Sequence, residues 1–410
     1  MQKRWRTAVI GIVMVSVLLA VPLVGCGGDG PEPKNVITIG NITDLTGPAG
    51  PALVDLTMGL HDLVRHINEE DPIPGVELKV IDYDDKMDPS RDIPGYEWLR
   101  GRGAEVLIAP VEYSATVLKN RAEQDQVPIF CLTASTTLVE DPGWAFCVNN
   151  LARWTTLTAL KWIGEQWDYS NGVPKIGCIA HTATGGIECN TSLREYCQAN
   201  PDSFEWVEGF LVPFGTVSWT GEIAKLKDCD YIGLPLLSAT SMATFIKDFR
   251  NAGHSGQFFT QEALPAFMGF IADSVGYDRV DGAIAGMSTG WWTDSAPVVK
   301  MLKDLVETYH PDEAAKVIHS GNGYVGGGIQ QYFILEIIRK AAEDAGAGEN
   351  LTGKAIYDTA CNFRLTMEGF TEWGFTSTKR TCLDYVAIYT VSAQQETLVR
   401  ASDWLPLVQG

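Results

Sequence analysis

The fold of this chain is decided by residues 36–82, VITIGNITDLTGPAGPALVDLTMGLHDLVRHINEEDPIPGVELKVID, in which two short apolar runs flank one long amphipathic stretch. Residues 36–40 and 77–82 are rich in valine and isoleucine and predict strands, whereas residues 56–67 repeat apolar side chains at helical spacing. The order strand, helix, strand is typical of a βαβ unit in a parallel sheet. We therefore expect an α/β fold.

The same alternation continues along the chain in two series. The first adds strands at residues 105–109 and 127–132, with helices over 96–102 and 115–124. The second begins with a helix over residues 155–167 and adds strands at 175–180, 205–211, 231–234, 257–260 and 282–286, with helices over 187–199, 221–227, 241–252 and later 328–345. With 410 residues, 45% of them hydrophobic, the chain can bury two cores, so two Rossmann-like lobes are expected.

Residues 1–25 have the composition of a secretory signal. Three basic residues precede an apolar run over residues 8–23, and Cys26 stands where bacteria attach lipid to exported proteins. Cleavage before Cys26 would leave a lipoprotein tethered to the membrane through residues 26–34. The competing interpretations are an ordinary signal peptide and a retained membrane helix, although Pro22 ends the apolar run before the ~20 residues that spanning requires. We expect an extracytoplasmic protein that touches the bacterial membrane only through its lipid.

Charge excludes one class of partner. The formal net charge is −20, and it would be −23 without the signal. Such a surface repels phosphate backbones, so no nucleic-acid partner is expected. The acidic residues are spread along the chain, which is also how a solvated surface is built.

Motifs for metal or cofactor binding are incomplete. The six histidines are scattered without an HExxH motif, and the aspartates between residues 82 and 88 lack the glycine and glutamate of a calcium loop. Residues 321–326, GNGYVG, match the dinucleotide fingerprint, but close helix packing explains these glycines better. We expect no metal and no cofactor. Among the eight cysteines after Cys26, Cys361 and Cys382 form the favoured disulfide, with buried free thiols as the alternative.

Two α/β lobes in an exported chain suggest a hinged binding protein that holds its ligand between the lobes, at the carboxyl ends of the strands. A series of short segments supports this idea: IG at 39–40, LTGPA at 45–49, IN at 67–68, DD at 84–85, DP at 88–89, VPI at 127–129, TAST at 133–136 and FRNAG at 249–253. In this order they resemble segments of the leucine/isoleucine/valine-binding proteins, which are type I periplasmic binding proteins serving ABC importers.

The resemblance implies two Rossmann-like lobes joined by a three-strand hinge. Lobe I would comprise residues 35–150 and 289–375, and lobe II residues 151–288 and 376–410. It further implies no enzymatic activity, a small-molecule ligand in the cleft, and an ABC permease in the membrane as partner. A sensor of the same fold, which reports the ligand without importing it, and an exported enzyme are the alternatives.

The resemblance also implies polar ligand contacts. Either Tyr113 or Ser114, at the start of a helix, would bind a ligand carboxylate, and Thr133 and Ser135 would contribute a backbone contact and a hydroxyl. Glu262 would pair with an α-amino group, because a carboxylate buried in a closed cleft needs a cation. The competing interpretations are a simple helix cap for Ser114, an ordinary turn for residues 133–136, and a solvated loop residue for Glu262.

Departures from the family enlarge the expected pocket. Small residues replace family aromatics at Ala52, at Gly185 or Thr184, and at Ser238. Trp154 and Trp291, close to the expected crossovers, are candidate stacking faces, although buried core positions are the commoner use of tryptophan. The ligand implied is an amino acid or a similar small amphipathic carboxylate, with an aromatic carboxylate lacking the amino group as the alternative.

Overall fold

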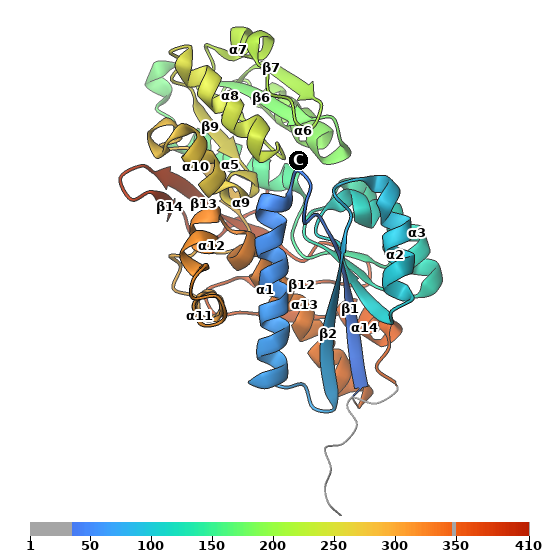
Figure 1. Ribbon diagram of the computed structural model, residues 1–410. Coiled ribbons are helices and arrows are strands. Elements are labelled where there is room, and N and C mark those ends of the chain that lie inside the picture. Colours follow the sequence, from blue (N-terminus) through green and yellow to red (C-terminus); the bar gives the residue numbers. More distant parts are fainter. Residues whose placement is uncertain (1–34, 347–349, 410) are drawn as a thin grey trace, which may run out of the picture. The chain divides into compact units, whose positions relative to one another are not determined.

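Five parallel strands form the first sheet, in the order β2-β1-β3-β4-β5. The computed structural model that shows it describes residues 35–346 and 350–409 (Figure 1). The strands are β1 (Asn35–Thr43), β2 (Val76–Asp84), β3 (Ala104–Ile108), β4 (Ile129–Cys131) and β5 (Ala145–Cys147). The helices between them are α1 (Gly50–Glu69), α2 (Asp92–Arg100), α3 (Glu112–Asp125) and α4 (Thr136–Val139), with a short 3-10 turn η1 (Pro89–Arg91).

The second sheet has the order β14-β13-β10-β9-β8-β6-β7, and β15 pairs with β13. Its strands from β7 to β10 are parallel, whereas β13 runs antiparallel to β10 and β14. The strands are β6 (Lys175–His181), β7 (Glu205–Val212), β8 (Tyr231–Gly233), β9 (Gln257–Thr260), β10 (Ile284–Met287), β13 (Tyr385–Ser392), β14 (Thr397–Arg400) and β15 (Leu405–Pro406). The helices are α5 (Ala152–Gln166), α6 (Thr184–Ala199), α7 (Thr220–Leu226), α8 (Ala239–Asn251), α9 (Ala263–Ala266) and α10 (Met268–Val275), with 3-10 turns η2 (Tyr169–Asn171) and η3 (Tyr277–Arg279).

The chain passes between the two sheets at three places: after β5, after β10 and before β13. After β10 it returns to the first sheet, where α11 (Pro297–Tyr309) and α13 (Gly323–Ala345) pack on α1, and α14 (Gly353–Ala360) contacts β3. The remaining elements are α12 (Ala314–Ser320) and the two-stranded pair β11 (Arg364–Thr366) and β12 (Glu372–Gly374). The passages are hydrogen-bonded to one another: the Asn150 amide donates to the Ser288 hydroxyl at 2.5 Å, and the Cys382 N–H donates to the Asn149 carbonyl at 3.0 Å.

Every strand and helix expected from the sequence is present, with ends shifted by a few residues. The α/β class is therefore confirmed. The structure adds elements that the sequence analysis did not name: the strands β5, β11, β12, β13, β14 and β15, and the helices α4, α9, α10, α11, α12 and α14. The expected signal and lipid attachment site at Cys26 lie outside the described residues. Within the described ranges, none of the helices is both long and apolar enough to cross a bilayer.

The expected Cys361–Cys382 disulfide is wrong. All eight cysteines in the described part of the chain are buried free thiols, which is the alternative interpretation. The Cys361 sulfur instead lies 3.7 Å from the Arg380 guanidinium, and Cys382 sits against β5, where its N–H donates to the Cys147 carbonyl at 3.1 Å. Each thiol is thus placed by the packing of its own strand or loop.

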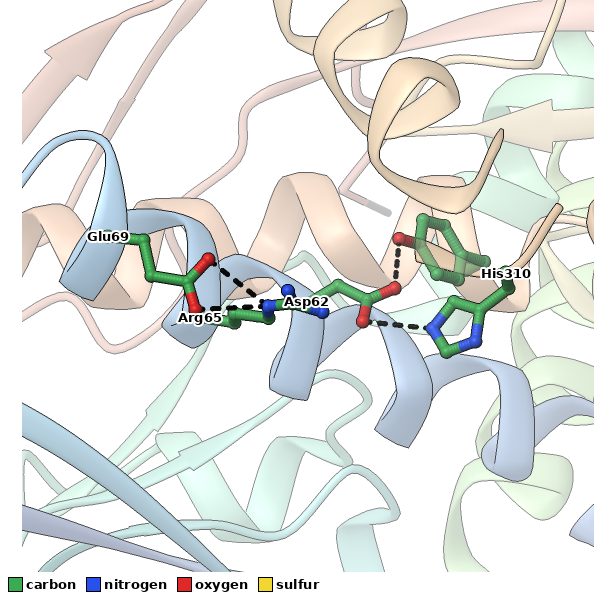
Figure 2. A network of polar contacts seen from close by, with 5 residues as sticks. Asp62, Arg65, Glu69 and His310 are labelled. Atoms are coloured by element: carbon green, nitrogen blue, oxygen red, sulfur yellow. Dashed lines mark hydrogen bonds and ion pairs between the residues drawn. The ribbon is translucent and has the colours of Figure 1, made fainter. Parts of the chain in front are cut away.

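A buried acid joins α1 to its neighbours (Figure 2). Asp62 on α1 is 5% exposed, and its carboxylate accepts hydrogen bonds from His310 at 3.0 Å and from the Tyr324 hydroxyl at 2.6 Å. One turn further along α1, Arg65 pairs with Glu69 on the exposed side of the helix. Since His310 follows α11 and Tyr324 opens α13, Asp62 fixes the contact of three helices.

Within residues 321–326, Gly323 serves helix packing, as the sequence analysis favoured, and so does Gly327 directly after them. A Cβ at Gly323 would lie 2.5 Å from the Ala52 carbonyl oxygen of α1, and one at Gly327 would lie 2.8 Å from Leu56. Only glycine allows α13 to approach α1 this closely. The contact matters for function because the N-terminal halves of both helices face the cavity described below.

Candidate ligand-binding site

One cavity of about 560 Å³ gathers the carboxyl ends of all the parallel strands. From the first sheet it is lined by Pro48 after β1, Met87 after β2, Tyr113 after β3, Thr133 after β4 and Asn149 after β5. From the second sheet it is lined by His181 at the end of β6, Phe214 after β7, Leu236 after β8, Glu262 after β9 and Thr289 after β10. Carboxyl ends of parallel strands are where α/β folds bind ligands, and here two sheets converge on one space.

The cavity wall is mainly apolar. Leu53 and Leu56 of α1 form one side, and Leu237 and Phe267 contribute from the second sheet's side. Neither lysine nor arginine lines it within the described ranges. His181 is the one basic side chain on this wall, and burial lowers its pKa, which favours the neutral ring. The cavity thus offers hydrocarbon contact with few charges.

Two of the apolar lining residues adopt backbone conformations that are unfavourable for their type. Met87 has φ of 54° and Leu236 has φ of 58°, both in the left-handed region. Such residues cost about 1 kcal/mol or more each and cluster at functional sites. Met87 follows β2 and Leu236 follows β8. In each sheet, a hydrophobic residue on the cavity wall therefore adopts a strained backbone conformation.

Of the two candidates at the start of α3, Tyr113 lies on the cavity wall and Ser114 does not. The Tyr113 hydroxyl is buried and has no hydrogen-bond partner among the described residues. Ser114 is 1% exposed, and its hydroxyl donates to the buried Asp85 at 3.1 Å. A carboxylate ligand contact by Ser114 would require this bond to break.

Thr133 lines the cavity, whereas Ser135 does not. The Thr133 hydroxyl accepts the backbone N–H of Glu112 at 3.1 Å and donates to the Pro110 carbonyl at 3.3 Å, so it holds the start of α3. Ser135 is buried before α4, and its hydroxyl lies 3.2 Å from that of Thr137. Of this pair, only Thr133 is placed to contact a ligand.

Glu262 lines the cavity and is tied to the passages between the sheets. One carboxylate oxygen accepts the Ser288 N–H at 2.8 Å, and the other accepts the Asn149 side-chain amide at 2.8 Å. Burial raises the pKa of Glu262, and hydrogen bonds from Ser288, Asn149 and Thr289 oppose that rise. Glu262 therefore connects the first and second passages while facing the ligand space.

Ser238 lines the cavity, but the two candidate tryptophans do not. Ser238 caps α8 by accepting the Ser241 N–H at 3.2 Å. Trp291 is buried in the core, where its indole N–H donates to Thr397 at 2.9 Å, and Trp154 packs on the core formed around the first sheet. Neither tryptophan presents a stacking face to the cavity, so the core interpretation describes both.

The sequence analysis missed Glu112, which lines the cavity at the first position of α3. Its carboxylate accepts the N–H of Gly185, in the first turn of α6, at 3.2 Å. Burial raises the pKa of Glu112 to about 7, the Gly185 amide lowers it, and the nearby Glu188 raises it. A Cβ at position 185 would lie 3.0 Å from this carboxylate. The absence of a side chain at Gly185 therefore makes room for Glu112.

Comparison with known proteins identifies the family. The model of the periplasmic binding protein family matches residues 36–396. No curated protein matches the chain. Among solved structures, a branched chain amino acid ABC transporter protein from Thermus thermophilus with bound valine has a TM-score of 0.78 at 16% identity, covering 91% of this chain and 97% of that one.

Two further structures are similar over comparable lengths. A fatty acid ABC transporter substrate-binding protein from Thermomonospora curvata has a TM-score of 0.77 at 14% identity, covering 90% of this chain and 92% of that one. A solute binding protein from Rhodopseudomonas palustris BisB5 in complex with 3,4-dihydroxy benzoic acid has a TM-score of 0.72 at 16% identity, covering 91% and 97%. The expected resemblance, and with it a binding protein rather than an enzyme, is confirmed: this chain belongs to the periplasmic binding protein family, as an extracytoplasmic solute-binding protein.

Proposed function

We propose that this protein captures a small molecule in the cavity between its two sheets and delivers it to an ABC permease for import, while a lipid on Cys26 anchors it to the membrane. One observation carries the proposal: a largely apolar space of about 560 Å³ at the carboxyl ends of every parallel strand. A cavity of this size fits a small molecule.

The proposed mechanism is closure of two lobes around the ligand. We assign residues 35–150 and 289–375 to lobe I, and residues 151–288 and 376–410 to lobe II. Two hydrogen-bonded pairs join these lobes: the Gly185 N–H donates to Glu112, which lines the cavity, and the Thr136 N–H donates to Glu188 at 3.0 Å. In each pair a carboxylate meets a helix N-terminus, a favourable arrangement that would form on closing.

The family resemblance suggests an amino acid or a similar amphipathic carboxylate as ligand, with Glu262 opposite the amino group. Similar structures contain valine, 3,4-dihydroxy benzoic acid and benzoate. The aromatic carboxylate remains the alternative. Within the cavity, Tyr113, Thr133 and Ser238 are the proposed polar residues in contact with the ligand, because these residues line it.

The test combines identification and transport. The purified protein is denatured, and the released small molecules are identified by mass spectrometry; uptake of the identified molecule is then compared in cells with and without the protein. Loss of uptake supports import. Normal uptake with a lost transcriptional or signalling response would instead assign a sensor, and a protein that neither releases nor binds any small molecule would overturn the binding function.

A further inference from the structure

The acids on the cavity wall outnumber its bases. Glu112 and Glu262 line the cavity, and the only basic side chain on the same wall of the described chain is His181, whose ring favours the neutral form because it is buried. A ligand that carries only negative charge would enter without a cationic partner. Charges buried without a partner are costly, so the charge of the wall restricts the ligand.

The Glu112 carboxylate lies where an anionic ligand group would be expected to bind. The start of α3 offers helix N–H groups and the helix dipole, which attract anions. Here the chain places its own carboxylate at the first helical position, and the backbone N–H of that residue is already accepted by Thr133. Because burial raises the pKa of Glu112 to about 7, a ligand carboxylate at this point would meet a like charge at close range once the pH rises above neutral.

Glu112 also has hydrogen-bonding capacity left. Its Oε1 accepts one bond, from Gly185, and its Oε2 has no hydrogen bond to any described residue. Both oxygens of Glu262, in contrast, are already held by Ser288 and Asn149. Glu112 is therefore the less engaged acid on this wall, with one whole oxygen left to accept a donor from a ligand.

Further negative charge lies behind Tyr113. Asp44, Asp85 and Asp92 are buried at 1%, 2% and 0% exposure, and their charges act on the Tyr113 hydroxyl. Both carboxylate oxygens of Asp92 lack a hydrogen-bond partner among the described residues. Burial raises the pKa of Asp92 to about 7 and raises that of Asp85 as well, so this group adds negative potential on the first sheet's side of the cavity mainly as the pH rises through neutral.

We infer that the ligand is a molecule with a hydrocarbon body and a positively charged amine, and that Glu112, rather than Glu262, binds the amine. This inference rests on the proposed function and specifies its ligand. In an amino acid the amine would be the recognised group, and an aromatic or aliphatic carboxylate without an amine would be rejected. The apolar wall would hold the hydrocarbon body.

Binding is tested with matched triads measured by calorimetry: phenylalanine, 2-phenylethylamine and 3-phenylpropionate, then leucine, 3-methylbutylamine and 4-methylpentanoate. We expect each amine to bind at least tenfold more tightly than the acid with the same hydrocarbon. Glu112→Gln keeps the shape but removes the charge, and it should abolish this preference.

Glu188→Gln is the matched control, because Glu188 also accepts a helix N–H from the other lobe but does not line the cavity. This variant should keep the amine preference even if all affinities fall. Equal or tighter binding of the acids by the parent protein would overturn the inference, as would an unchanged amine preference in Glu112→Gln.

The natural ligand provides a second test of the inference. A basic nitrogen in the molecule released on denaturation supports the inference when no triad member binds, and a released anion without one overturns it. Absence of any released or bound molecule would instead refute the proposed function itself, so the two failures are distinguishable.

Discussion

Replacement of Glu262 should lower the stability of the ligand-free protein as well as its affinity for ligand, because the Glu262 carboxylate holds two passages between the sheets. In Glu262→Ala the Ser288 N–H and the Asn149 amide, each donating at 2.8 Å, lose their acceptor. An unsatisfied buried donor costs about 1–3 kcal/mol, and relief from burying the carboxyl group offsets part of this. We expect the free energy of unfolding to fall by about 3 kcal/mol.

Glu262→Gln should lower the free energy of unfolding by less, about 1–2 kcal/mol. One oxygen remains as an acceptor, while the new NH₂ group faces one of the two donors. If Glu262 instead of Glu112 holds the amine, as the family resemblance suggests, this variant should also lose roughly 30-fold or more in affinity, the effect of ~2 kcal/mol for a broken buried charge pair, while Glu112→Gln keeps the amine preference. Urea unfolding without ligand measures the first effect, and calorimetry measures the second.

Two control variants separate these effects. Glu69→Gln changes an acid that is about half exposed and should shift the unfolding free energy by less than about 0.5 kcal/mol. Ser135→Ala alters a buried serine that does not line the cavity, so affinity should stay within about twofold. If Glu262→Ala unfolds like the parent protein while only its affinity falls, Glu262 is a ligand contact alone and the hinge argument is refuted.

Four further outcomes are expected. The affinity for an amine should rise from pH 5.5 to pH 8, because the ionised form of Glu112 binds the amine. Burial raises the pKa of Glu112 to about 7, the Gly185 amide lowers it, and Glu188 raises it further. Calorimetry should therefore show an affinity that changes with pH in the parent protein and a flat profile in Glu112→Gln. Asp62→Asn should lower the unfolding free energy by about 1–3 kcal/mol, since one of its bonds to His310 and Tyr324 loses its acceptor; an unchanged urea midpoint would contradict the helix-joining role. Cys26→Ala should release the protein from the membrane fraction or leave an uncleaved precursor, and a cleaved form that stays membrane-bound would argue against the lipid anchor. The radius of gyration by small-angle scattering should decrease at saturating ligand, whereas an unchanged value would count against lobe closure.

The order of strands and helices was predictable because central parallel strands such as β1 and β3 are buried on both faces and show as apolar runs. The edge strands β2 and β7 are partly exposed, but each still contains enough apolar residues to be recognised. The α1 region illustrates this, since its leucines repeat at helical spacing and are buried in the structure. The strand β13, residues 385–392, has an equally clear pattern and could have been named. The three-residue β5 could not, because so short a segment carries no periodicity.

The site was predictable only in part. Tyr113, Thr133, Ser238 and Glu262 were named from the family resemblance, and all four line the cavity. Trp291 shows the limit: it directly follows a passage between the sheets, but its indole is bonded to Thr397, far along the chain. Side-chain direction is set by such long-range packing, which a local pattern does not contain.

The residues that were missed have a physical reason in common. Met87 and Leu236 face the cavity through left-handed backbone conformations, which local sequence does not announce for these residue types. Glu112 looks like an ordinary acidic residue in the first turn of a helix. Only the facing Gly185, from a distant helix, shows that room was left for its carboxylate.

Because α13 packs closely on α1, one wall of the cavity tolerates fewer substitutions than the other, in evolution as in protein engineering. A side chain at Gly326 would lie 2.9 Å from Thr289, and those at Gly323 and Gly327 would collide with α1, so this wall tolerates almost no mutation. The opposite wall, with Phe214 and Ser238, is built from side chains that can be exchanged. Relatives and designed variants with a new ligand preference should therefore differ mainly on the second sheet's side, while the glycine-lined wall is inherited unchanged.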